Sequence, residues 1–99
     1  MTVYVDELFT ATPRIAQVRY HGMRWCHLTA DTLDELHEFA AKLGLKREWF
    51  QGHHRNPAFW HYDLTANKRV QAVRLGAKEL TWREAAEKRN KAMGEGRKT

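Results

Sequence analysis

Residues 24–45 read RWCHLTADTLDELHEFAAKLGL and hold the strongest local signal in this chain of 99 residues. Thr32-Leu33-Asp34-Glu35 is a capping box, and its acids suit the positive end of a helix dipole. Apolar residues then recur at the spacing of one helix face: Leu33, Leu36, Phe39, Ala40 and Leu43. Gly44 can supply the left-handed residue that ends many helices, with Leu45 as the usual apolar follower. The pattern predicts a helix from Asp31 or Thr32 to Leu43, with His37 at the edge of its apolar stripe.

The residues before this helix, 24–29, predict a short strand. Alternation along a strand should place Trp25 and His27 on one face and Cys26 and Leu28 on the other. Further strands are predicted over residues 2–6, 59–64 and 78–80. Two more helices are predicted: one from Thr65 to about Leu75 with Val70, Ala72 and Val73 inward, and one from a second capping box, Thr81-Trp82-Arg83-Glu84, that frays over residues 94–99. Residues 7–22 and 51–57 read as loops, the first lined by the basic residues Arg14, Arg19 and His21.

Strands that alternate with capped helices favour an α/β fold, with a small three- to four-stranded, partly parallel sheet packed with two to three helices. We expect residues 1–87 to form a single domain and residues 88–99 a basic, fraying C-terminal tail. Ligands of such sheets bind at the carboxyl ends of strands. Asp6, the turn at 29–31 and the turn at 61–65 should therefore meet at one edge.

The composition limits the class of protein. A chain of this length has one hydrophobic core at most, and a hydrophobic share of 42% is enough to form it. No apolar run is long enough to span a membrane, and the N-terminal residues do not resemble a signal peptide. Cys26 is the single cysteine, so an intrachain disulfide and a cysteine-based zinc site are excluded. We expect a soluble, cytoplasmic domain with no membrane partner.

The formal net charge of +5 is concentrated at one end of the chain. Residues 88–99 hold five basic residues and one acid, which amounts to +4. The net charge of the remaining residues is close to zero, so the distribution of charge favours a local anion pocket over a broad basic face.

Several of these residues together resemble a known family. Trp25-Cys26-His27-Leu28-Thr29-Ala30-Asp31, followed by Glu35-Leu36-His37 and Phe39-Ala40, is similar to the bacterial and phage proteins called domain of unknown function 4031. The likeness continues through Gly44, His61-Tyr62-Asp63, Arg69 and Gly76-Ala77, and so covers most of residues 2–84. It implies no particular reaction, but it marks these family-motif positions: Arg24, His27, Asp31, Glu35, His37, His61, Tyr62, Asp63 and Arg69.

His27, His37 and His61 are candidates for acid–base catalysis, because histidine changes charge near neutral pH. Two imidazoles on either side of a phosphodiester could take a proton from a ribose hydroxyl and give one to the leaving oxygen, with Arg24 or Arg69 holding the charge. No metal would be needed. The alternative is that His27 and His61 are strand residues bonded to nearby backbone groups.

A metal site is a weaker possibility, built from His27, His37, His61 and either Asp63 or Asp31. The spacing argues little for it, since the chain has no H-E-x-x-H and His53-His54 falls in a predicted loop. The phosphate-binding and dinucleotide-binding glycine motifs are also absent from the sequence. Our leading interpretation therefore includes no metal and no cofactor.

Arginines among aromatic residues favour a nucleotide ligand, because guanidinium groups bind phosphate and aromatic rings stack on bases. The leading hypothesis is a pocket that takes a phosphate-bearing nucleotide or nucleotide-derived signal, lined by Arg24, His27, His37, His61, Tyr62, Asp63 and Arg69. The resemblance to phage proteins suggests that such a pocket sequesters a host immune messenger, in a homo-oligomer that deepens it.

Two alternatives remain. The same pocket could belong to a metal-independent phosphodiesterase or nuclease with histidine as acid and base, so whether the protein is an enzyme is open. The basic tail could instead bind nucleic acid nonspecifically, although the sequence carries no recognised nucleic-acid-binding motif.

Overall fold

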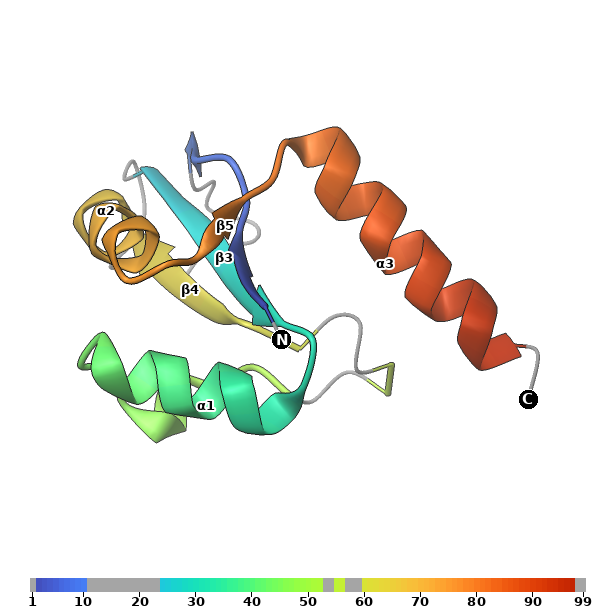
Figure 1. Cartoon of the computed structure of the whole chain (residues 1–99), viewed down its shortest axis with the longest axis horizontal. Coiled ribbons are helices and arrows are strands. Elements are labelled where there is room, and N and C mark those ends of the chain that lie inside the picture. Colours follow the sequence, from blue (N-terminus) through green and yellow to red (C-terminus); the bar gives the residue numbers. More distant parts are fainter. Residues whose placement is uncertain (1, 11–23, 53–54, 57–59, 98–99) are drawn as a thin grey trace.

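The computed structural model describes residues 2–10, 24–52, 55–56 and 60–97 (Figure 1). Its elements are β1 (Val3–Val5), β2 (Phe9–Thr10), β3 (Arg24–Ala30), α1 (Leu33–Lys42), the single 3₁₀ turn η2 (Arg47–Trp49), β4 (Tyr62–Thr65), α2 (Ala66–Arg74), β5 (Lys78–Glu79) and α3 (Trp82–Arg97). No helix among these described residues is both long and apolar enough to cross a bilayer.

Strand β3 is the centre of the sheet. Its Trp25 pairs with both Phe9 of β2 and Thr65 of β4, so β2 and β4 lie on opposite edges of β3. Leu28 pairs in the same way with Val5 of β1 and Tyr62 of β4. Strands β1 and β2 therefore follow one another along one edge of β3, and β5 runs parallel to β1 beyond them. This mixed sheet, four strands wide in its described part and packed with three helices, confirms the predicted α/β class.

The hydrophobic core lies on one face of this sheet, which we call the core face. Alternate strand residues point into it and are fully or almost fully buried: Val5, Cys26, Leu28, Tyr62 and Leu64. Helices α1 and α2 cover this face, through Leu36, Ala40 and Ala72 among others. Figure 1 shows them on one side of the strands, while α3 stands on the other side. The alternation predicted for residues 25–28 is confirmed.

Helix α3 lies over the opposite face, which we call the open face. Its capping box forms as predicted, since the Glu84 amide donates to the Thr81 hydroxyl over 3.1 Å and the Thr81 amide donates to the Glu84 carboxylate over 2.9 Å. The Trp82 amide donates to the Glu7 carboxylate over 2.6 Å, which ties the start of the helix to the end of β1. Further along, the Lys88 ammonium lies 3.4 Å from the Asp31 carboxylate.

The helix from residue 31 or 32 to residue 43 is confirmed within one or two residues at each end. The Thr32 hydroxyl accepts from the Glu35 amide over 3.2 Å and donates to the Glu35 carboxylate over 2.9 Å. Gly44 has a φ of 77°, a backbone conformation that side chains with a Cβ rarely adopt. The Leu45 amide then closes the end of the helix on the Ala40 carbonyl at 3.0 Å.

Four local predictions are wrong in part. Residues 9–10 form β2, although residues 7–22 were predicted to be a loop, because two residues are too few to show alternation and their pairing is set by β3. Strand β4 begins at residue 62 and ends at residue 65, against a prediction of 59–64 whose first residue lies outside the described residues. Val70 is 50% exposed, since the inward stripe of α2 runs through Arg69, Ala72 and Val73. Helix α3 continues to Arg97 in place of fraying from Gly94. A glycine costs a helix only about 1 kcal/mol, and good helix formers precede this one.

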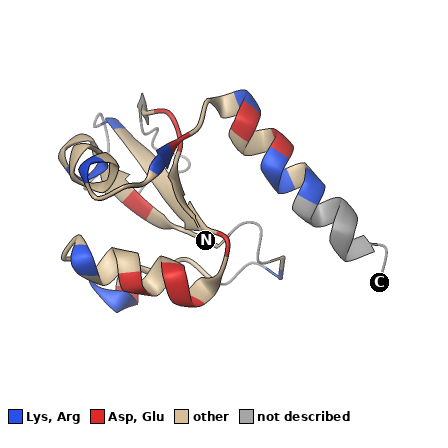
Figure 2. Cartoon of the chain, viewed as in Figure 1, with Lys and Arg blue, Asp and Glu red and all other residues tan. Residues whose placement is uncertain are grey.

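The predicted gathering of strand ends is also wrong for one of its three parts. Strand β3 runs antiparallel to both β1 and β4, so the turn at 29–31 lies beside the start of β1, where the Asp31 amide donates to the Thr2 carbonyl over 3.0 Å. Arg14, Arg19, His21 and His53-His54 lie outside the described residues. The expected domain boundary at residues 87 and 88 falls inside α3, whose described part carries acidic residues between basic ones (Figure 2).

Candidate functional site

The candidate site lies on the open face, around His27 at the middle of β3. Asp63 of β4 is its direct cross-strand partner, and Asp6 lies opposite it on the other edge, immediately after β1. One histidine is thus flanked by two carboxylates from the two neighbouring chain segments. Trp25, two residues earlier on the same face, contacts the imidazole edge to face with ring centres 5.4 Å apart.

Asp6 holds His27 by two hydrogen bonds. One carboxylate oxygen accepts from the His27 backbone amide over 2.7 Å, and the other is 2.7 Å from the ring nitrogen Nδ1. The carboxylate thereby takes the place of the Asp6 carbonyl in the ladder, and that carbonyl accepts from Nε of Arg69 over 2.8 Å. When neutral, a ring that donates Nδ1–H to a carboxylate carries its lone pair on Nε2.

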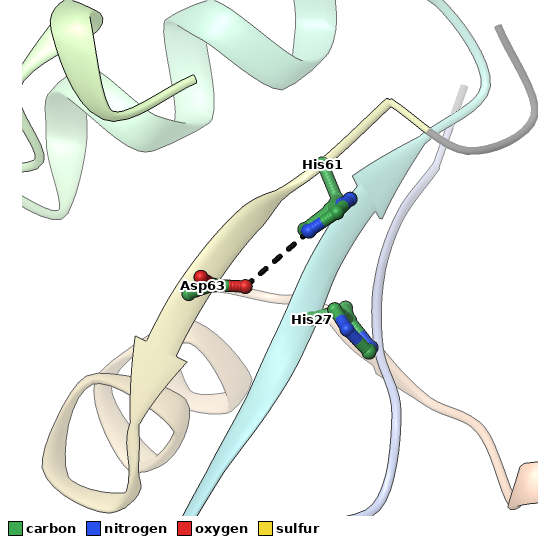
Figure 3. A group of neighbouring side chains, drawn as sticks. All are labelled: His27, His61 and Asp63. Atoms are coloured by element: carbon green, nitrogen blue, oxygen red, sulfur yellow. Dashed lines mark ion pairs between the residues drawn. The ribbon is translucent and has the colours of Figure 1, made fainter. Parts of the chain in front are cut away.

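Asp63 and His61 form the second half of the site. Oδ1 of Asp63 lies 3.3 Å from Nε2 of His61, along the dashed line of Figure 3. Oδ2 accepts from the side-chain amide of Gln51 over 2.6 Å. Gln51 also holds the backbone of His61, because the backbone amide of Gln51 donates to the His61 carbonyl over 2.9 Å. The Asp63 side chain is 9% exposed, and among the described residues Oδ1 has no hydrogen-bond donor.

The two halves meet through the imidazoles. The rings of His27 and His61 are centred 4.7 Å apart at an interplanar angle of 84°. One metal-binding atom from each of His27, His61 and Asp63 can be chosen so that all three lie within 4.8 Å of one another. The ring of Trp82, from the first residue of α3, is centred 6.4 Å from that of His27. Such a cluster can transfer protons between two imidazoles or hold a cation.

The other predicted site residues lie elsewhere. His37 and Tyr62 are on the core side, where Nδ1 of His37 lies 2.8 Å from the Tyr62 hydroxyl. Arg69 of α2 donates to the Asp6 carbonyl and, over 3.0 Å, to the Glu79 carboxylate. Arg24 is exposed at the start of β3, at a position that shares the alternation of Cys26. Of the seven predicted pocket residues, the structure brings together His27, His61 and Asp63.

Burial sets the protonation of the groups on the core side. Desolvation, with the nearby Arg47 guanidinium, lowers the pKa of His37 below its ordinary 6.5, so this imidazole is neutral at pH 7. Burial likewise raises the pKa of the Tyr62 hydroxyl. Burial and then the Asp6 carboxylate raise the pKa of the Cys26 thiol to about 12, which excludes Cys26 as a thiolate nucleophile at neutral pH.

Sequence reasoning placed Asp6 at the ligand-binding edge of the sheet but did not name it among the pocket residues, and it did not assign Gln51 or Trp82 to the site. Asp6 had a usable signal, because an acid at a strand end can face a histidine of the neighbouring strand. No sequence pattern indicates Gln51, because an isolated β-bridge to His61 sets its position. Trp82 was recognised only as a large apolar residue in the first turn of a helix.

Comparison with known proteins agrees with the resemblance seen in the sequence. The model of the family described as "Protein of unknown function (DUF4031)" matches residues 3–92, and the chain belongs to this family. Neither a curated protein nor a solved structure matches the chain.

Proposed function

We propose that this member of the family binds a nucleotide-type phosphodiester on the open face and cleaves it with His27 and His61. The proposal rests on one observation: the two imidazoles are in contact, and each lies beside its own carboxylate, Asp6 or Asp63. Asp6 at Nδ1 of His27 fixes the tautomer of that ring, and Asp63 lies beside His61, so the two imidazoles are arranged as an acid–base pair requires.

The reaction divides between the two rings. Nε2 of His27 takes the proton of a ribose 2′-hydroxyl, whose oxygen forms a bond to phosphorus. The bond from phosphorus to the 5′-oxygen breaks, and that oxygen receives the proton of the His61 imidazolium. The products are a 2′,3′-cyclic phosphate and a 5′-hydroxyl, and the two histidines have exchanged protonation states.

Cleavage fits the geometry better than binding alone. The binding hypothesis relied on Arg24 and Arg69, and Arg69 uses its Nε and one terminal nitrogen on Asp6 and Glu79. The proposed pocket therefore loses its main phosphate anchors, while the histidine pair is assembled. A protonated His61 would supply positive charge to the bound phosphate in their place.

The test uses uridylyl-3′,5′-adenosine, its 2′-deoxy analogue and a 3′,5′-cyclic diribonucleotide, analysed by chromatography after denaturation. We expect cleavage of both ribose substrates and none of the deoxy analogue, which lacks the nucleophile. His27→Ala and His61→Ala should each lower turnover by about 10²- to 10⁴-fold. His37→Ala is the matched control, a histidine of the other face, and should retain turnover. Equal turnover in all three variants would remove the pair from the reaction.

Sequestration is the outcome that would replace this proposal. Tight binding followed by recovery of intact ligand, unchanged in His61→Ala, would support capture of a nucleotide messenger. In that case a phage-encoded homo-oligomer acting in the host cytoplasm remains our prediction, which light scattering with and without the cyclic dinucleotide would check. The proposal gives no role to residues 88–99, and nonspecific nucleic-acid binding through their net charge of +4 stays a prediction, which the salt dependence of RNA binding with and without these residues would check.

A further inference from the structure

We propose that His27, His61 and Asp63 bind a divalent transition-metal ion of the zinc class. Two imidazoles and one carboxylate would be its protein ligands, and at least one position would remain for water or a phosphate oxygen. The binding claim stands on geometry alone, whereas any effect of the ion on turnover rests on the proposed function.

The spacing of the three residues suits such an ion. Zinc binds imidazole nitrogen and carboxylate oxygen at about 2.0–2.2 Å, so the edge of a tetrahedral site is about 3.3–3.5 Å. Nε2 of His61 and Oδ1 of Asp63 are 3.3 Å apart. The ligand atoms of all three residues lie within 4.8 Å of one another. Side-chain rotations that move these atoms by about 1 Å, without backbone movement, would therefore complete the site.

The groups that form hydrogen bonds with these ligands are of the kind that surrounds metal ions in other proteins. Metal-binding histidines usually donate their second ring nitrogen to a carboxylate or carbonyl, which fixes the ring and raises its basicity. Asp6 accepts from Nδ1 of His27 in this way at 2.7 Å, and the Gln51 amide holds Oδ2 of Asp63 at 2.6 Å. These outer contacts use Nδ1 of His27 and Oδ2 of Asp63, so the ion would be bound through Nε2 of His27 and Oδ1 of Asp63.

Asp63 supplies an independent indication, because one of its carboxylate oxygens lacks a hydrogen-bond donor among the described residues. Its side chain is more than nine-tenths buried, and Oδ1 accepts no hydrogen bond from the described residues. A buried carboxylate oxygen in this state has lost its hydration without gaining a hydrogen bond in return. Figure 3 shows this carboxylate directed toward His61, with His27 on the neighbouring strand, so an ion placed between them would satisfy it.

The charge of the site and the types of its ligands limit which metal ions it can bind. Asp6 and Asp63 place two carboxylates around imidazoles that a metal requires to be neutral, and a divalent cation would balance them. Magnesium and calcium prefer sites made of oxygen ligands, whereas two nitrogens with one oxygen favour Zn²⁺, Co²⁺, Ni²⁺ or Fe²⁺. The cross-strand pairing of His27 with Asp63 fixes the backbone positions of two of the ligands.

The test titrates the full chain, stripped with a chelator, with Co²⁺ followed by visible absorption and with Zn²⁺ followed by calorimetry. We expect one strong site per chain and the intense absorption of four- or five-coordinate Co²⁺. His27→Gln, His61→Gln and Asp63→Asn should each abolish the strong site. Asp6→Asn should keep the ligand but weaken affinity by about 10- to 100-fold, because its amide nitrogen cannot accept the Nδ1 proton.

Two controls separate this site from unspecific binding by histidines. His37→Gln and the double variant His53→Gln/His54→Gln should retain one strong Co²⁺ site with the same spectrum. Circular dichroism identifies any variant that fails to fold. If a histidine variant fails to fold, Asp63→Asn, which preserves side-chain shape, still tests the site. The inference is overturned if no strong site is found, or if the control variants lose it while Asp63→Asn retains it.

Turnover of uridylyl-3′,5′-adenosine, measured with the ion and with chelator, separates the two proposals. An ion that takes both imidazole lone pairs should suppress the acid–base reaction, and the chelator should restore it. Strong Co²⁺ binding without cleavage in either state would support the metal site and reject the proposed function. Cleavage in chelator without any Co²⁺ site would do the reverse.

Discussion

The two faces of the sheet each hold a histidine bonded through Nδ1, and their partners differ. On the core side, His37 lies 2.8 Å from the Tyr62 hydroxyl and in edge contact with Phe50. On the open face, His27 lies 2.7 Å from the Asp6 carboxylate. The distances are alike, but His37 lies beside a hydroxyl among aromatic rings, whereas His27 lies beside a carboxylate, the kind of partner that orients metal-binding histidines in other proteins.

The difference shows that the face of the sheet, more than the residue type, decides the environment of each histidine here. Alternation puts Tyr62 into the core and Asp63 onto the open face, although the two are neighbours in sequence. A three-residue motif, His61-Tyr62-Asp63, therefore contributes to both regions.

The largest expected effect that tests the comparison of the two faces comes from substitutions at two neighbouring residues of β3. Leu28 is fully buried on the core face, and Leu28→Ala should lower the free energy of unfolding by about 2–5 kcal/mol through lost burial and a cavity. Thr29 points to the open face and is half-buried, so Thr29→Ala should cost about 1 kcal/mol or less. Urea denaturation of both variants gives the two values. Equal losses would show that the open face is packed as closely as the core.

Sequence patterns predicted the elements whose signals are local. The capping boxes at Thr32 and Thr81, the glycine at the end of α1 and the alternation of β3 are short-range features, and all of them are confirmed. The family resemblance is also confirmed.

The site was predictable only in part, because its assembly depends on strand pairing. The sequence placed His27, His61 and Asp63 among the candidates, but it also grouped with them His37, Arg24 and Arg69. Only the antiparallel register brings Asp63 beside His27, and only the bridge from Gln51 positions His61. Neither feature leaves a periodic pattern in the chain.

A smaller effect is expected from the pH response of His37. Its pKa is lowered in the folded protein by burial and by Arg47, with Asp34 acting in the opposite direction and the Tyr62 hydroxyl facing Nδ1. The unfolded chain thus binds this proton more tightly, so the contribution of His37 to stability is complete above about pH 6.5 and is lost as the pH falls toward the folded pKa. Urea midpoints measured between pH 7.5 and 5.5 should fall more in the wild type than in His37→Gln. Parallel curves would contradict the assignment of His37 as a neutral, structural histidine.

The smallest effect should come from the contact that holds α3 over the open face. The Lys88 ammonium lies 3.4 Å from the Asp31 carboxylate and 4.5 Å from the centre of the Tyr4 ring, but both charged side chains are about two-fifths exposed. Water and salt screen such a pair, so a double-mutant cycle of Lys88→Gln with Asp31→Asn should give a coupling of about 0.5 kcal/mol that shrinks in 1 M salt. The cycle is required because Asp31 also accepts from the Tyr4 hydroxyl and the Thr2 amide, so Asp31→Asn alone overstates the contact. A coupling well above 1 kcal/mol that resists salt would mean that α3 is fixed as firmly on its face as α1 and α2 are on theirs.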